Sequence, residues 1–297
     1  MAHRRALLAI ALLALVAALP ELAPRSLTSA GAVSELDVRS RAQNAPFLGA
    51  LAGALDERIT SFSGSAGVVV FDPRAGVLYE RNADELVPTA SLYKLGVLLE
   101  AERRVEAGEL RYDEPVEITD EDLVEGDLFA LPDSLTVDAA LEWMIGASSN
   151  VAAQALLRRF GSERVNRTLE RAGISPFRVE PDEYVASPRA VARFFAALAR
   201  GSLLSRAASA RMLERLTRQR IADRLPAGLP AGTRVAHKTG NLGYATHDAG
   251  IVFTSAGRPI VVVVMTWDSG EAEAVELIRD VAARVYRAYE DPKPRLP

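Results

Sequence analysis

The chain has 297 residues, of which 49% are hydrophobic and 25% charged, and its formal net charge is −4. This composition is typical of a globular protein with one large or two modest domains, and the absence of a basic stripe argues against nucleic acid as a partner. The lack of cysteine excludes disulfides and thiolate metal sites, and three histidines are too few for the usual clustered zinc site. We therefore expect no metal and no cofactor.

Residues 1–32 are predicted to be an export signal. A basic start at His3-Arg4-Arg5 precedes an apolar run from Ala6 to Leu19, and Ala30-Gly31-Ala32 offers a small-x-small cleavage site. The alternative is an uncleaved anchor, but the run is shorter than the ~20 residues that span a bilayer. We therefore expect a secreted or periplasmic monomer with no stable membrane span after cleavage.

Residues 33–45 are polar and are predicted to be a linker. A helix is expected from Pro46, because apolar residues then recur at helical spacing: Leu48, Leu51, Leu55, Ile59 and Phe62. Two β-rich runs, 68–71 and 77–80, flank a turn at 72–76 and predict a hairpin.

The segment from 90 to 208 is mainly helical in pattern, with strands returning only after residue 234. The run 260–266 is almost continuously hydrophobic, which favours a central strand buried on both faces. An amphipathic helix closes the chain. The pattern predicts an α/β domain built from residues 46–89 and 209–297, with an all-α domain inserted at 90–208.

Lysine is rare, with only three among 35 basic residues, and two of the three stand in short motifs. The first motif is Ser91-Leu92-Tyr93-Lys94. If Ser91 begins a helix, Lys94 follows one turn later and its amine can reach the hydroxyl. A neutral lysine can then take the serine proton, but lowering its pKa from ~10.4 to near 7 costs on the order of 4–5 kcal/mol. Burial and a second cation are the usual causes. Ser-x-x-Lys also occurs by chance on many helices.

Two further motifs add to this pair. Ser148-Ser149-Asn150 is either an N-cap cluster or a proton relay at Ser148 with an amide at Asn150 that holds a substrate carbonyl. Lys238-Thr239-Gly240 is either an exposed strand end or a site in which Lys238 supplies charge and Thr239 binds a carboxylate. Gly240 would let a substrate lie close to the strand. The backbone N–H groups of Ser91 and Asn241 are the expected oxyanion donors.

Together and in this order, the three motifs resemble those of the penicillin-recognising serine hydrolases, the class A β-lactamases and penicillin-binding D,D-peptidases. The resemblance covers roughly residues 46–290. It implies an α/β plus all-α fold of the β-lactamase/transpeptidase type, with an antiparallel sheet of about five strands flanked by the N- and C-terminal helices. It also implies a cleft in which Ser91 forms an acyl-enzyme with a small-molecule β-lactam or a D-Ala-D-Ala peptide. A β-lactamase, a D,D-carboxypeptidase and a weakly catalytic β-lactam-binding protein all remain open.

The chain departs from the class A pattern at two places. Class A enzymes carry Glu-Pro-x-Leu-Asn, whose glutamate activates the deacylating water; here Glu180-Pro181 matches, but Leu-Asn is missing and the loop is shortened. Glu180, Asp182 and Glu183 are open as the base, as is the interpretation that they are surface acids. His247 stands where class A enzymes place an arginine for the substrate carboxylate. It either binds that carboxylate or packs beneath the strand.

Overall fold

The computed structural model describes residues 35–124, 131–180 and 183–290, with side chains of the first helix from Phe47 onward. The predicted signal segment, residues 1–32, lies outside these ranges, as does Asp182. No helix within the described ranges is long and apolar enough to cross a membrane.

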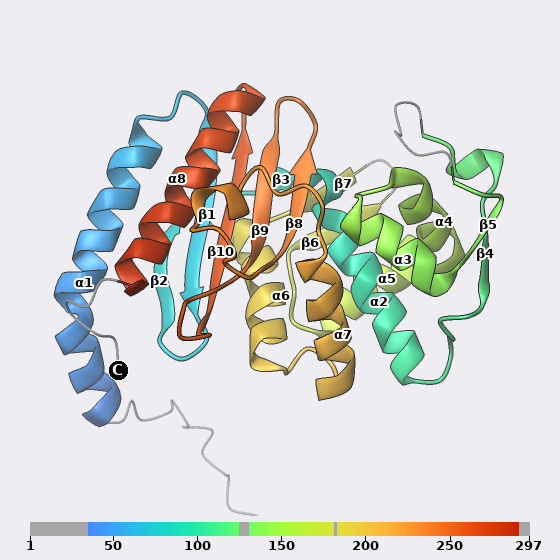
Figure 1. Cartoon of the computed structure of the whole chain (residues 1–297), viewed down its shortest axis with the longest axis horizontal. Coiled ribbons are helices and arrows are strands. Elements are labelled where there is room, and N and C mark those ends of the chain that lie inside the picture. The colour runs from blue at the N-terminus through green and yellow to red at the C-terminus, as the bar shows by residue number, and fades with distance from the viewer. Residues whose placement is uncertain (1–34, 125–130, 181–182, 291–297) are drawn as a thin grey trace, which may run out of the picture.

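A five-stranded antiparallel sheet forms the centre of the molecule, in the order β2-β1-β10-β9-β8 (Figure 1). The strands are β1 (Ser65–Asp72), β2 (Gly76–Arg81), β8 (Val235–Asn241), β9 (Thr246–Phe253) and β10 (Pro259–Trp267). The sheet therefore joins the two ends of the described chain, and it confirms the predicted fold class. It leaves β8, which carries the Lys238 motif, as an edge strand.

The central strand is β10, and its interior is buried along its whole length. Val262 and Val264 pack into the core under the terminal helices, whereas Val261 and Val263 pack into the core on the opposite face. This is the alternation of a strand covered on both sides. The prediction made from the continuous hydrophobic run is confirmed.

One face of the sheet is covered by α1 (Glu35–Thr60) and α8 (Glu271–Glu290), which lie side by side (Figure 1). Helix α1 begins at Glu35, so most of the predicted linker, residues 33–45, is helical. The reason is compositional: the segment is polar, but its Glu, Leu, Arg, Ala and Gln residues are all good helix formers.

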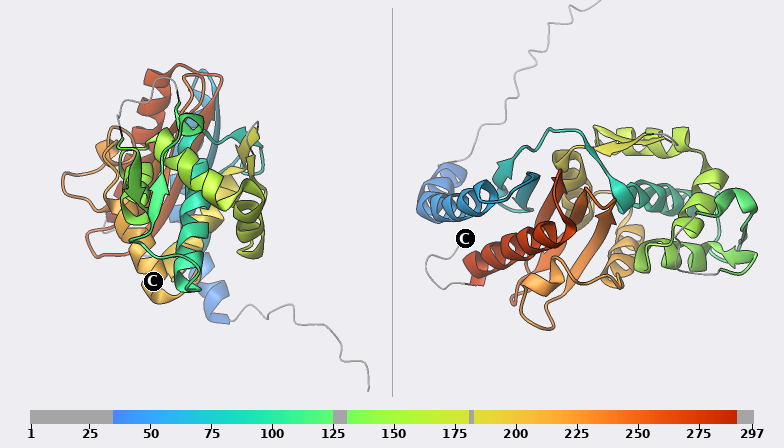
Figure 2. Two further views of the ribbon diagram at one scale, coloured as in Figure 1. Left: turned by 90° about the vertical axis from the view of Figure 1, so that its right-hand side faces the viewer. Right: turned by 90° about the horizontal axis from the view of Figure 1, so that it is seen from above.

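The remaining helices are α2 (Lys94–Glu106), α3 (Val137–Gly146), α4 (Asn150–Phe160), α5 (Ser162–Arg171), α6 (Pro188–Arg200) and α7 (Arg206–Thr217). Seen from above, α2 to α5 gather at the end of the molecule away from α1 (Figure 2). Helix α6 instead packs on the second face of the sheet, against β1 and β10. One hydrophobic core therefore runs from the helices into the sheet, through residues such as Leu141, Phe194 and Val263.

Two small sheets and three 3-10 turns complete the fold of the described part of the chain. The strands β3 (Val87–Pro88), β7 (Glu183–Ala186) and β6 (Phe177–Glu180) form a small sheet in that order. β4 (Pro115–Glu117) pairs with β5 (Ser134–Thr136). The 3-10 turns η1 (Ala90–Tyr93), η2 (Asp120–Asp122) and η3 (Pro226–Gly228) connect larger elements.

Candidate active site

Ser91 lies in the 3-10 turn η1, which runs directly into α2 at Lys94. The residue before it, Ala90, has a φ of 46°, a left-handed conformation that is uncommon for a residue with a side chain. Such backbone strain is found preferentially at functional sites. The turn leaves the Ser91 side chain partly exposed and brings its Oγ to 3.0 Å from Lys94 Nζ.

Lys94 is fully buried, and its amine lies among oxygen atoms of Ser148 and Asn150 at the start of α4. Its Nζ lies 2.6 Å from the Ser148 carbonyl oxygen and 2.7 Å from Asn150 Oδ1. A neutral amine has two N–H donors and one lone pair. If the two shortest contacts take the donors, the lone pair is left to accept the Ser91 hydroxyl proton, as a general base requires.

Ser148 stands between the two motif lysines. Its hydroxyl lies 3.3 Å from Lys94 Nζ and 2.9 Å from Lys238 Nζ. Its φ of 59° is again left-handed, so both hydroxyl-bearing segments of the site are strained. Ser149, by contrast, caps α4: its Oγ accepts a hydrogen bond from the Ala152 N–H. In this motif Ser149 is thus the helix cap, and Ser148 is the serine to which the relay interpretation applies.

Lys238 on β8 is fully buried and donates to the Thr239 carbonyl oxygen at 3.0 Å as well as to Ser148. Burial holds the pKa of Lys238 well below its usual range, and the nearby charges of Lys94 and Arg224 lower it further, while Asp248 opposes them. The predicted alternative, an exposed edge-strand lysine, does not describe this residue.

The rest of the β8 motif lies against the Ser91 turn. A Cβ placed on Gly240 would come within 2.9 Å of the Thr89 carbonyl oxygen and 3.0 Å of the Ala90 Cβ, so only glycine allows this approach. Thr239 is buried, whereas Asn241 is exposed and donates through Nδ2 to Glu271 Oε1 at 2.5 Å.

His247 lies beneath the strand. Because β9 begins at Thr246, the residue is fully buried, and its Nε2 donates to the Pro88 carbonyl oxygen at 2.8 Å. Its Nδ1 accepts the Thr266 N–H at 3.1 Å, so both ring nitrogens are satisfied within the fold. Burial lowers the pKa of His247 to about 4, and the ring is neutral at physiological pH. The position of His247 therefore corresponds to the alternative in which it packs beneath the strand, and not to the one in which it binds the substrate carboxylate.

The sequence reasoning missed a buried cation, Arg224. The residue is 3% exposed, and one guanidinium nitrogen donates to the carbonyl oxygens of Gly240 at 2.7 Å and His247 at 2.9 Å. It therefore places positive charge under the end of β8 close to Lys238. No local signal distinguishes it, because the chain is rich in arginine and Arg224 lies in a loop without a motif.

A cavity of about 450 Å³ opens above Ser91 and Asn150. Tyr93 and Tyr184 form one wall, with their rings stacked at 4.3 Å between centroids and 11° between planes. Other lining residues come from several elements, and they include Val124, Gln154, Leu242 and Tyr244. Three of these, Val124, Leu242 and Tyr244, are exposed apolar or aromatic side chains, so the cavity has an apolar rim.

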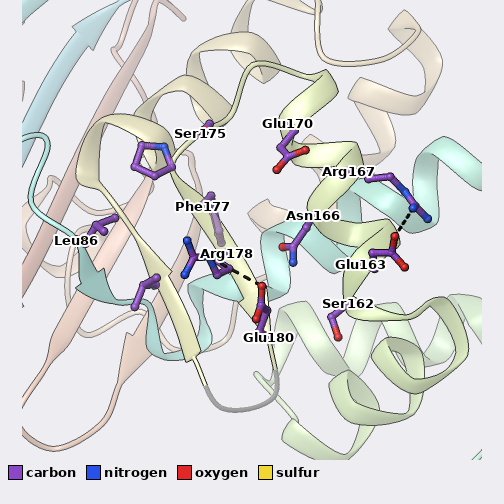
Figure 3. Close-up of a pocket in the computed structure, with 12 residues that line it drawn as sticks. Leu86, Ser162, Glu163, Asn166, Arg167, Glu170, Ser175, Phe177, Arg178 and Glu180 are labelled. Atoms are coloured by element: carbon purple, nitrogen blue, oxygen red, sulfur yellow. Dashed lines mark hydrogen bonds and ion pairs between the residues drawn. The ribbon is translucent and has the colours of Figure 1, made fainter.

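The two acids of the shortened loop lie in different cavities. Glu183, at the start of β7, lines the Ser91 cavity, whereas Glu180, at the end of β6, lines a separate cavity of about 550 Å³ beside α5 (Figure 3). Arg178 pairs with Glu183 at 2.7 Å and contacts Glu180 at 3.9 Å. Of these two candidates for the deacylation base, only Glu183 shares a cavity with Ser91.

Comparisons with known proteins agree with this geometry. The β-lactamase enzyme family matches residues 50–289. The β-lactamase of Streptomyces fradiae is 32% identical over 246 residues, which cover 74% of this chain and 79% of its own. An ancestral class A β-lactamase is 29% identical with a TM-score of 0.75, over 80% of this chain and 100% of its own.

A variant of PBP-A, solved as an acyl-enzyme complex with penicillin G, shares the fold with a TM-score of 0.75 at 24% identity, over 83% of this chain and 97% of its own. The family match spans the sheet, the helical part and the cavity between them, including all three motifs. The chain belongs to the β-lactamase enzyme family.

Proposed function

We propose that this protein hydrolyses β-lactams through an acyl-enzyme on Ser91. The observation that carries the proposal is the contact of Lys94 Nζ with Ser91 Oγ at 3.0 Å, in a site where Ser148 links Lys94 to Lys238. A serine hydroxyl needs a base to become a nucleophile, and the Lys94 amine is a titratable group within hydrogen-bond distance of it.

In the acylation step, Lys94 takes the Ser91 proton as Oγ attacks the carbonyl carbon of the β-lactam. The resulting oxyanion is held by the backbone N–H groups of Ser91 and Asn241, at the end of β8. The C–N bond of the ring then breaks, and the ring nitrogen receives a proton from the Ser148 hydroxyl, which is replenished from Lys94 at 3.3 Å. Asn150 holds the side-chain amide of the substrate.

Substrate orientation comes from the positive side of the cleft. β-Lactam antibiotics carry a carboxylate close to the ring, and Thr239 and Lys238 lie on the strand that would face it. Arg224 reinforces the field from beneath Gly240, 2.7 Å from its carbonyl oxygen. Charged donors in a site shielded from water are worth more than the same groups in solution.

The deacylation step needs a water molecule and a base. We assign the base to Glu183, because it shares the cavity with Ser91 and Glu180 does not. Glu183 takes a proton from water as the water oxygen attacks the ester carbonyl carbon. The ester C–O bond breaks, and the proton held by Glu183 is returned to the Ser91 oxygen as it leaves.

The site of action follows from the N-terminal pattern. We assign residues 1–32 to a cleaved signal peptide, so the mature protein would act in the periplasm or outside the cell, as a monomer. N-terminal sequencing of the protein isolated from the envelope fraction of expressing cells tests this assignment. A cleaved protein begins near Val33 instead of Met1.

A single kinetic comparison tests the function. The purified protein is mixed with a chromogenic cephalosporin and with a fluorescent penicillin, in parallel with Ser91→Ala. Steady turnover that disappears in the variant supports β-lactam hydrolysis through Ser91. A stable fluorescent adduct without turnover contradicts the hydrolytic assignment; release of D-alanine from a muropeptide would then identify a D,D-carboxypeptidase, and its absence a binding protein. Unchanged turnover in Ser91→Ala would remove the whole assignment.

A further inference from the structure

Asp248 is a buried carboxylate that the proposed reaction does not use. It is fully buried on β9, where it is the register partner of Thr239. Side chains alternate along a strand, so Asp248 lies on the face of Val252, which packs under the terminal helices. Lys238 lies on the other face, with Ala249 as its register partner. Asp248 thus lies on the strand next to that of Lys238, and the two side chains are on opposite faces of the sheet.

Two N–H groups hold this carboxylate in place. Its Oδ2 accepts the backbone N–H of Leu225 at 3.0 Å, and its Oδ1 accepts Nδ1 of His237 at 2.9 Å. Both partners are themselves buried. The Leu225 contact also fixes the backbone next to Arg224, whose guanidinium lies under Gly240.

The other buried charges in this part of the site are positive. Lys94 on α2, Lys238 on β8 and Arg224 in the loop before η3 are all buried. The other acids near them are half-exposed: Glu271 on α8 lies 3.5 Å from Arg224, and Asp223 lies 3.6 Å from it. His237 and His247 complete the surrounding titratable groups, the latter neutral. Within the described ranges, Asp248 is the buried anion of this cluster.

We infer that Asp248 is a positioning residue for the proposed reaction. From the far face of the sheet it supplies the countercharge that holds the proton on Lys238, and through Leu225 it keeps Arg224 docked beneath β8. The effect of Asp248 on the pKa of Lys238 has this sign: it opposes burial and the charges of Lys94 and Arg224. The inference rests on the proposed function, because it concerns the charge state in which the site is active.

The test is the pH dependence of acylation by a fluorescent penicillin, measured between pH 6 and 10 in the wild type and in Asp248→Asn. Without the countercharge Lys238 loses its proton at lower pH, so the alkaline limb of the acylation rate moves down by about one pH unit. His237→Gln keeps the carboxylate and leaves the limb in place. If the asparagine variant does not fold, Asp248→Ser replaces it, because the serine hydroxyl can still accept the Leu225 N–H. The same downward shift of the alkaline limb is expected.

The matched control is Asp72→Asn, which neutralises another buried aspartate of the same sheet, bonded to Arg258 and Tyr289 far from the site. It should leave the alkaline limb unchanged. The inference is overturned if the alkaline limb of the acylation rate stays at the wild-type pH in the neutral Asp248 variants. It is also overturned if Asp72→Asn moves that limb by the same amount. If the wild type is not labelled at Ser91, it is the proposed function that fails.

Discussion

Lys94 and Lys238 reach the same hydroxyl group: their side-chain nitrogens lie 3.3 Å and 2.9 Å from Ser148 Oγ. Two amines that share a buried acceptor repel each other when both are charged. Their titrations are therefore coupled, and the pH profile of the reaction reports the pair instead of either lysine alone. One proton on the pair gives a base at one end of the hydroxyl and a cation at the other, which is the arrangement that acylation needs.

The first prediction concerns the stability cost of this arrangement. Lys238→Met should lower the acylation rate on the order of 100-fold, because the cation of the cleft is lost. The same change should raise the free energy of unfolding by about 1 kcal/mol at pH 7, because a buried charge is replaced by an apolar chain of similar length. Thermal unfolding and stopped-flow acylation measure the two effects; a variant that loses both activity and stability would contradict the prediction.

The pH dependence of that stability difference has a definite sign. The pKa of Lys238 lies lower in the folded protein than the ~10.4 of the unfolded chain. The unfolded state therefore binds more protons in the interval between the two values, and the stability of the wild type rises with pH there. The gain in unfolding free energy from Lys238→Met should therefore shrink as the pH approaches about 10. Denaturant unfolding of both proteins across this pH range measures the difference.

The second prediction separates the two acids of the β6–β7 hairpin. Glu183→Gln should retain acylation but lower deacylation on the order of 100-fold, because the water loses its base. The acyl-enzyme should then accumulate and be visible as added mass on the intact protein. Glu180→Gln is the matched control, since the residue lies in the same hairpin but lines the other cavity, and its kinetics should match the wild type. Equal effects from both variants would refute the assignment.

The third prediction concerns the close approach of β8 to the Ser91 turn. Gly240→Ala would bring a methyl group to 2.9 Å from the backbone oxygen of Thr89, which cannot move without displacing Ser91. We expect a loss of roughly 1–3 kcal/mol in the free energy of unfolding, with acylation reduced as well. Gly49→Ala in α1 meets nothing within 4 Å and should be neutral or stabilising. Calorimetry of the two variants makes the comparison.

The fourth prediction tests the stacked wall of the cavity. The Tyr184 ring lies on Tyr93, and the Tyr184 carbonyl oxygen accepts the Thr89 N–H at 2.7 Å. Tyr184→Ala should cost about 1–3 kcal/mol in stability and slow turnover, because the strand carrying Glu183 loses its packing against η1. Tyr184→Phe keeps the ring and should behave as the wild type in the same melting and turnover assays. A silent alanine variant would show that the stack is dispensable.

Much of this site could be predicted from the sequence because it consists of short local motifs. Lys94 follows Ser91 by one turn, and Lys238 lies in a β-rich run with Thr239 and Gly240 next to it, so short local spacing carries the information. The central strand β10 was predictable for a similar reason: a strand covered on both faces has no polar positions.

The rest depends on contacts between distant segments. Arg224 reaches Gly240 from a loop, and Asp248 is held by Leu225 of that loop and by His237 of β8, which are distant from it in the sequence. Glu180 and Glu183 are register partners across the β6–β7 hairpin, and the cavity that each one lines depends on the element packed beside it, α5 for Glu180 and the Ser91 turn for Glu183. The start of α1 was missed because polar helix formers and linkers have similar compositions.

The hydrophobic core that continues from the helices into the sheet has a consequence for how the molecule unfolds and works. With Leu141 of α3 and Val263 of β10 in one cluster, the two sides of the cleft cannot melt independently, and we expect one cooperative transition. The distances between Ser91, Ser148 and Lys238 are then set when the chain folds, so a substrate meets dipoles and charges already in place and little reorganisation remains for the reaction itself.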